Sequence, residues 1–164
     1  MTMRIAGVVS VALLMLAGCA AQPRPVPFAA PGSELVLERS VRFPAGSTRI
    51  YFQHGQPVTE RQLTVWEHHC ALALDHAFDT VTDIAAARWP VANTQRRSTL
   101  GEWGYGVITY ESTFYLDAAA YPMYALYCEI WTLDGGYLHQ RHLTAEGLAE
   151  VLGDWLRLES RERH

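Results

Sequence analysis

The stretch of sequence that decides the fold runs from Tyr105 to Leu133 and reads YGVITYESTFYLDAAAYPMYALYCEIWTL. Ile108, Tyr110, Phe114 and Leu116 share one predicted face, and the pattern resumes at Tyr124, where Leu126, Cys128 and Ile130 follow on the same predicted face. A period of two is typical of a half-buried β-strand. The sequence therefore predicts two strands, over 105–116 and 124–133. Asp134-Gly135-Gly136 then favours a tight hairpin, with a returning strand over 137–142.

Working outward from this centre, earlier segments show the same alternation. A strand is predicted over Leu35–Phe43, and a turn at 44–47 would join it in a hairpin to a second strand over Thr48–Gln53. A further strand is predicted over His68–Leu74, with Cys70, Leu72 and Leu74 on one face. The stretch 89–99 is weaker strand sequence, 60–66 is ambiguous, and 77–87 fits either a short helix or an irregular link.

The chain closes with a predicted helix. Thr144 fits its N-cap, and Leu148, Val151, Leu152 and Trp155 form an apolar stripe at helical spacing. With this helix, the sequence predicts a mainly β fold (α+β by count), an antiparallel sandwich or open barrel with one C-terminal helix. Residues 34–164 would form one globular domain.

The sequence predicts an export signal at the N-terminus. Arg4 precedes an apolar run of about twelve residues, too short for the ~20 that a spanning helix needs. The run ends in Leu16-Ala17-Gly18-Cys19, which resembles the lipobox of bacterial lipoproteins. The resemblance implies cleavage after residue 18, acylation of Cys19 with chains such as palmitate, and a lipid anchor. The same resemblance implies that Ala20 at the next position, in place of an aspartate, favours the outer membrane, facing the periplasm, over the inner membrane.

Residues 19–33 would then form the lipidated cysteine and a proline-rich tether. Export bears on the other two cysteines, because disulfides persist in an oxidising compartment. Cys70 and Cys128 both belong to apolar strand faces, so both should point inward. The sequence predicts a bridge between them, which would stabilise the fold by about 4 kcal/mol on the chain-entropy model.

A second resemblance covers the first third of the domain. Phe43-Pro44-Ala45-Gly46 leads into Arg49-Ile50-Tyr51-Phe52-Gln53 and is followed by a strand cysteine, Cys70. This arrangement is similar to a group of proteobacterial envelope lipoproteins that has no assigned chemistry. The resemblance supports the fold and implies no reaction.

Composition and motifs exclude several functions. The net charge of −4 and the lack of any basic run disfavour nucleic acid as a partner. No catalytic residue, cofactor site or metal site is predicted. His68 and His69, like His139 and His142, would point to opposite faces of their strands. Cys70 has a better use in the disulfide than as a nucleophile beside His68. The carboxylates Glu111, Asp117 and Glu129 are scattered along the predicted strands.

Aromatic residues give the one indication of binding. Tyr115, Tyr127 and Trp131 fall on the strand faces opposite the apolar stripes. Either this second face is exposed and suits a protein or glycan partner, or the C-terminal helix covers it. The sequence thus predicts a non-enzymatic envelope lipoprotein with a protein-interaction or accessory role. The alternative is a ligand-binding or inhibitor-like module using the aromatic face, and an unrecognised hydrolase is the third candidate.

Overall fold

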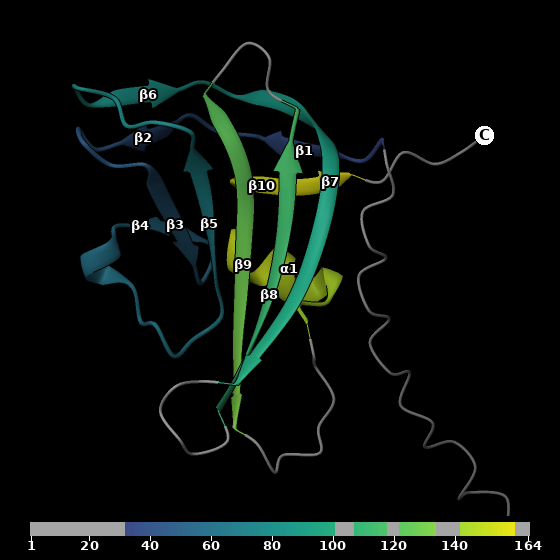
Figure 1. Cartoon of the computed structure of the whole chain (residues 1–164). Helices are drawn as coiled ribbons and strands as arrows, with labels where there is room; N and C mark the ends of the chain where they lie inside the picture. Colours follow the sequence, from purple (N-terminus) through teal and green to yellow (C-terminus); the bar gives the residue numbers. More distant parts are fainter. Residues whose placement is uncertain (1–31, 101–106, 118–121, 134–141, 160–164) are drawn as a thin grey trace, which may run out of the picture.

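The computed structural model describes residues 32–100, 107–117, 122–133 and 142–159. Within them, eight antiparallel strands form one sheet that curls into a half-barrel, in the order β10-β1-β7-β8-β9-β5-β3-β4, and β2 and β6 pair separately (Figure 1). The predicted fold class is confirmed, in the form closer to an open barrel. The strands are β1 (Glu34–Leu37), β2 (Val41–Phe43), β3 (Arg49–Gln53), β4 (Gln56–Val58), β5 (His69–Leu74), β6 (Thr82–Ile84), β7 (Ala87–Leu100), β8 (Val107–Leu116), β9 (Met123–Leu133) and β10 (Leu156–Glu159).

The stretch that decides the fold forms the middle of this sheet. The strands predicted over 105–116, 124–133 and 68–74 are confirmed as β8, β9 and β5. β8 and β9 pair over most of their length, and β5 joins the other edge of β9. The predicted strand over 89–99 is confirmed within β7, which pairs first with β1 and then with β8. Its register shifts between Val91 and Asn93, where β7 leaves β1 for β8. A bulge bends and twists a strand, which helps the sheet to curl.

The prediction of one strand over 35–43, and of its hairpin with 48–53, is wrong. The segment divides into β1 and β2, which belong to different sheets. β1 pairs with β7 and β10, whereas β2 pairs with β6. Between β1 and β2 the chain no longer pairs with β7 and β10. There the backbone N–H of Glu38 donates to the carbonyl of Trp155 at 2.8 Å. Alternation continues across Arg39, so the pattern alone hides the break.

Short elements fill the segments left ambiguous by the sequence. β3 and β4 form a tight hairpin whose two turn residues, His54 and Gly55, both have positive φ. A 3-10 turn, Glu60–Gln62, follows. The stretch 77–87 is neither helix nor a wholly irregular link, because it contains β6. The predicted hairpin at 134–136 and its returning strand lie outside the described residues, apart from His142.

Helix α1, Ala145–Leu152, begins as predicted, with the Thr144 hydroxyl accepting from the amide of Gly147 at 3.1 Å. It is shorter than predicted. Gly153 caps its end, and Trp155 lies beyond it, where the chain turns into β10. The helix buries Leu148, Val151 and Leu152 in the core. In Figure 1, α1 lies behind the strands β8 and β9. No helix among the described residues is both long enough and apolar enough to cross a membrane.

The core lies on the face of the sheet that α1 covers. It contains the inward residues of β3, β5, β8 and β9 together with those of β1, β2 and α1, and its largest fully buried members include Phe43, Phe52, Leu72, Leu126 and Leu152. Cys70 and Cys128 lie directly opposite each other on β5 and β9, with Cα atoms 4.0 Å apart and sulfurs bonded at 2.11 Å. The predicted disulfide is confirmed, and it ties together two neighbouring strands inside this core.

Candidate functional site

The opposite face of the sheet, called here the second face, carries the predicted aromatic residues. Directly opposed residues of antiparallel strands share a face, and Tyr127 is flanked by Thr113 on β8 and Ala71 on β5. Tyr115 pairs with Ala125, and Trp131 pairs with Thr109. All three predicted aromatic residues therefore lie on the second face, and each is partly exposed.

The alternative in which the C-terminal helix covers these rings is wrong. Leu148, Val151 and Leu152 of α1 pack in the same core as Leu126 and Ile130, whose neighbours on β9 point to the other side. One further prediction needs correction. Tyr124 does not belong to the buried face, since it is 40% exposed and its ring lies 5.6 Å from that of Tyr115 and 6.3 Å from that of Tyr127. The register between β5 and β9 shifts between Ala73 and Leu74, next to the position of Tyr124, so simple alternation fails there.

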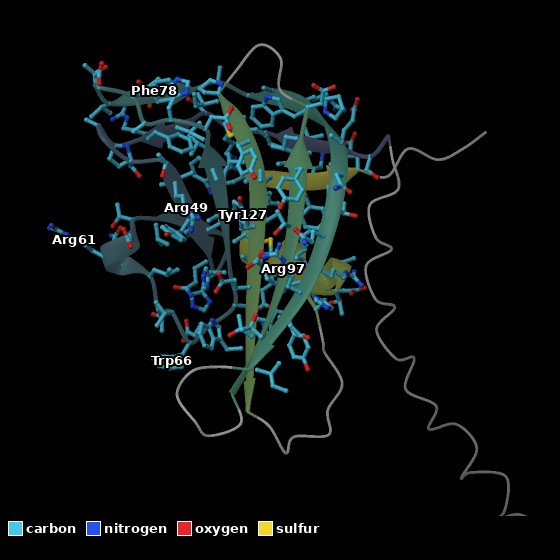
Figure 2. The ribbon with its side chains drawn as sticks, viewed as in Figure 1. Arg49, Arg61, Trp66, Phe78, Arg97 and Tyr127 are labelled. Carbon is cyan, nitrogen blue, oxygen red and sulfur yellow. A yellow bond between two sulfur atoms is a disulfide. The ribbon has the colours of Figure 1, made fainter. Side chains whose placement is uncertain are left out.

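Long side chains continue the tyrosine cluster in both directions. The Arg49 guanidinium lies 5.2 Å from the ring centre of Tyr127, a cation–π contact that spans the small residues Ala71 and Ala73 on β5 (Figure 2). At the other end, Gln95 joins Tyr115 to Arg97. In the orientation that satisfies both neighbours, its amide donates to the Tyr115 hydroxyl at 3.1 Å and accepts from Arg97 at 3.0 Å. Burial, followed by hydrogen bonding with Tyr124, raises the pKa of Tyr127 to about 12.

A row of charged residues crosses the second face next to the tyrosines. Arg97, Glu111, Glu129 and His69 occupy successive paired positions on β7, β8, β9 and β5. Each has partners within the protein. Glu111 accepts from the Thr113 hydroxyl at 2.8 Å, and His69 donates from Nδ1 to the backbone carbonyl of Glu67 at 2.9 Å, with its Nε2 3.8 Å from Glu129. The structure thus aligns Glu111 with Glu129, which the sequence left scattered, and leaves Asp117 at the end of β8.

The segment Leu63–His68, called here the Trp66 loop, borders the second face. The Gln53 side chain makes two hydrogen bonds to the backbone of this loop, as a neighbouring strand would. Its amide nitrogen donates to the carbonyl of Thr64 at 2.9 Å, and its amide oxygen accepts from the backbone N–H of Thr64 at 3.0 Å. The Trp66 ring then lies 5.2 Å from that of Trp131, edge to face. Val65 and Trp66 remain 47% and 55% exposed. The sequence pattern does not indicate this loop, and the adjacent Val65-Trp66 pair in an ambiguous segment is its only signal.

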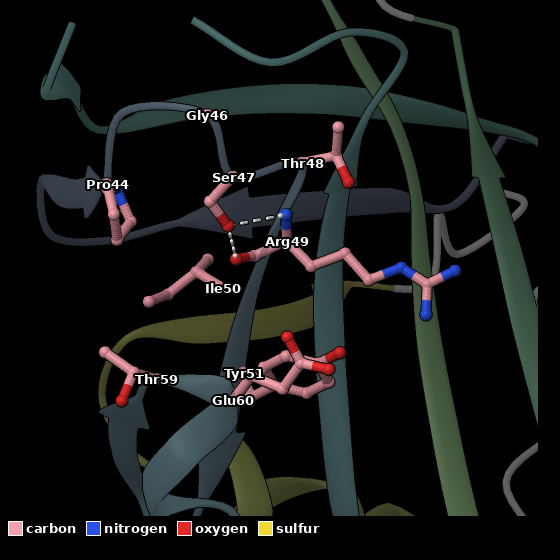
Figure 3. Close-up of a pocket in the computed structure, with 9 residues that line it drawn as sticks. All are labelled: Pro44, Gly46, Ser47, Thr48, Arg49, Ile50, Tyr51, Thr59 and Glu60. Atoms are coloured by element: carbon pink, nitrogen blue, oxygen red, sulfur yellow. Dashed lines mark hydrogen bonds between the residues drawn. The ribbon is translucent and has the colours of Figure 1, made fainter.

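We name the aromatic surface by five residues: Tyr115, Tyr124, Tyr127, Trp131 and Trp66. At its Arg49 end lies a cavity of about 340 Å³ between the 44–51 segment and the residues Thr59 and Glu60 (Figure 3). The Ser47 hydroxyl donates to the Arg49 carbonyl at 2.7 Å. The Arg49 side chain leaves the cavity and runs across β5 toward Tyr127, so the cavity walls are mostly neutral and polar (Figure 3).

The histidines named by the sequence do not converge. His69 lies on the second face, whereas His142 contacts Ser112 on the core side, with Oγ and Nδ1 3.2 Å apart. Burial and, less strongly, the nearby Arg96 lower the pKa of His142. His139 lies outside the described residues, as does Cys19. Within the described ranges, no three His, Cys, Asp or Glu side chains are grouped to hold a metal ion.

Comparisons of the chain with models of protein families, with curated proteins and with solved structures find no match. The interpretation of the second face therefore depends on its own geometry.

Proposed function

We propose that this chain is a lipid-anchored lipoprotein of the bacterial envelope whose domain binds a protein partner through the aromatic surface. The observation that carries the binding role is that α1 packs on one face of the sheet and leaves aromatic rings partly exposed on the other. Tyrosine and tryptophan are the residues on which protein interfaces most depend, because they bury large rigid surfaces and keep a polar group at the rim.

The membrane anchor in this proposal derives from the sequence. Arg4, the short apolar run and Leu16-Ala17-Gly18-Cys19 support export and acylation of Cys19, and Ala20 supports delivery to the outer membrane, facing the periplasm. Several acyl chains would hold the protein permanently, whereas one chain anchors only marginally. The disulfide between Cys70 and Cys128 suits such an oxidising compartment.

A binding role fits the charged row better than catalysis does. Glu111 accepts a hydrogen bond from Thr113, and His69 donates one to the backbone carbonyl of Glu67. Neither side chain is therefore directed into an open pocket. Ligand binding is the second candidate, favoured by the cavity of about 340 Å³ beside Arg49. That volume is at the lower end of the range for small-molecule sites. A glycan or peptide end held there would use the neutral polar wall and the tyrosines next to it.

The proposal is tested by crosslinking the tagged, full-length protein in cells, followed by capture and mass spectrometry. We expect one dominant envelope partner, with its yield reduced at least fivefold by Tyr127→Ala or Trp131→Ala. Val81→Ala is the matched control, because Val81 is 58% exposed and directly precedes β6, which pairs with β2 outside the eight-stranded sheet. Equal capture by all three variants would contradict the assigned surface. Cys19→Ala should move the protein to the soluble fraction, and continued membrane association would contradict the anchor.

A further inference from the structure

A second pocket opens beside the Trp66 loop, and the functions above do not use it. Its volume is about 330 Å³, and its lining residues are His54, Trp66, Glu67, His68, Glu150 and Val151. Three separate segments build it: the turn between β3 and β4, the Trp66 loop, and the last turn of α1. We call it the Trp66 pocket. Trp66 belongs both to this pocket and to the aromatic surface, because its ring also packs on Trp131.

The turn is fixed against the helix by two close backbone contacts. The Gly55 amide donates to the carbonyl of Val151 at 3.1 Å, and the Cα atoms of Gly55 and Gly153 are so close that a Cβ on Gly153 would lie 2.7 Å from Gly55. The Trp66 loop is fixed separately through Gln53 and Thr64. The pocket is therefore formed before any partner binds, which lowers the ordering cost of binding.

The charge of the pocket favours a cation. Glu67 and Glu150 contribute two carboxylates, and the C-terminal end of α1 adds the partial negative charge of a helix dipole. The last turn of α1 has no basic residue to offset that charge. Two histidines in the lining act against binding of a cation. They are His54, whose Nε2 lies 2.6 Å from a carboxylate oxygen of Glu67, and His68. Arg61, in the nearby 3-10 turn, extends away from the pocket (Figure 2).

The aromatic wall suits the same occupant. A lysine or arginine head placed over an indole face gains a cation–π attraction, which is strongest for tryptophan among the aromatic side chains. Its alkyl stem would lie on the apolar surface of Trp66, which lines the pocket and is 55% exposed. A free metal ion fits less well, since no group of three ligating side chains is present in the described part of the chain.

We infer that the Trp66 pocket receives a basic side chain, lysine or arginine, presented by the protein partner. The identity of the occupant as part of a protein rests on the proposed function, whereas its positive charge rests on the pocket alone. Contact at this point would place the partner over Trp66 and so over the adjoining Trp131 end of the aromatic surface.

The test uses n-butylammonium as a probe of the full-length protein in detergent, with n-butanol as the neutral control of equal length. Binding is followed by two-dimensional ¹H–¹⁵N NMR at the indole N–H of Trp66, assigned with Trp66→Phe. We expect a saturable shift with n-butylammonium and at least fivefold weaker binding of n-butanol. Glu67→Gln with Glu150→Gln should weaken the amine at least tenfold, whereas Glu146→Gln in the first turn of α1 should not change it.

Equal binding of amine and alcohol, or no loss in the Glu67→Gln, Glu150→Gln double variant, would overturn the inference. Thermal unfolding of each variant shows whether its fold is retained, and Glu150→Gln alone, on the exposed side of α1, provides a second variant. A saturable amine site without any captured partner would refute the proposed function only. A captured partner whose yield is unaffected by Glu150→Lys would refute the basic contact only.

Discussion

The packing of the β3–β4 turn against the end of α1 leads to a sharp prediction for Gly153→Ala. Gly153 has φ +56° and ψ −138°, a region that is nearly restricted to glycine. A Cβ there would meet the Gly55 Cα and carbonyl oxygen at 2.7 Å, whereas ordinary contacts begin at 3.4 Å. Both atoms belong to backbone, so no side chain can rotate away. The turn must move off the helix or the helix end must shift.

The magnitude follows from three contributions. Forcing a positive φ on alanine costs about 1–2 kcal/mol, and overpacking costs about 1–3 kcal/mol. Loss of the hydrogen bond from Gly55 to Val151 costs about 1 kcal/mol more. We therefore expect Gly153→Ala to lower the free energy of unfolding by about 3–6 kcal/mol, a large share of the ~5–15 kcal/mol typical of a domain.

Gly46→Ala is the matched control. Gly46 has a similar φ of +72°, but a Cβ there would meet no atom within 4 Å. Its cost should be the conformational cost alone, about 1–2 kcal/mol. Urea unfolding followed by tryptophan fluorescence, in a Cys19→Ala background, measures both variants. Losses that agree within 0.5 kcal/mol, on the order of mutant-cycle precision, would refute the claim that the Gly55–Gly153 contact is tight.

Three further predictions concern the disulfide, a tyrosine and the helix cap. Replacing both Cys70 and Cys128 by alanine should lower the free energy of unfolding by about 4 kcal/mol, given the separation of 58 residues, and an unchanged urea midpoint would contradict this. The pKa of Tyr127 is about 12 in the folded protein and ~10 when unfolded, so the folded state keeps its proton longer and stability falls as pH rises above 10. Tyr127→Phe should reduce that alkaline loss, as measured by unfolding between pH 9 and about 11.5, and an identical pH profile would argue against burial of the hydroxyl. Thr144→Ala removes the acceptor for the Gly147 amide and should cost about 1 kcal/mol in urea unfolding, whereas no loss would mean that water replaces the cap.

How far the fold follows from the sequence depends on which contacts are local. β5, β8 and β9 are predictable because period-two alternation directly encodes one buried face. β1 and β10 pair although they lie at opposite ends of the domain's sequence, and no local sequence pattern indicates a partner so distant. The predicted helix extends to Trp155 because its apolar spacing continues past the observed end at Leu152. Gly153 caps that end, and glycine after a last turn is a common helix terminator.

The candidate site shows the same division. Alternation places Tyr115, Tyr127 and Trp131 on one face, but it cannot tell what covers that face, because α1 could pack on either side. The face predicted for Tyr124 is wrong because a register shift between β5 and β9 changes the parity of alternation. The Trp66 loop depends on Gln53 and Thr64, whose paired hydrogen bonds imitate a strand without any strand pattern in the sequence.

The position of the proposed anchor relative to the aromatic surface bears on which partners are accessible. The proposed tether precedes β1 in the sequence, and β7 and β8 separate β1 from β9 in the sheet. At about 4.8 Å per strand, β1 lies ~14 Å across the sheet from β9, the strand of Tyr127. The proposed proline-rich tether that follows Cys19 adds up to ~40 Å between the lipid and the domain. The lipid therefore need not press the aromatic surface against the bilayer, and the surface can contact a partner several tens of ångströms from the membrane, on the order of the tether's reach.

Shortening the tether by deleting residues 22–29 should reduce capture of such a partner without affecting anchorage. Undiminished capture would place the partner at the membrane surface.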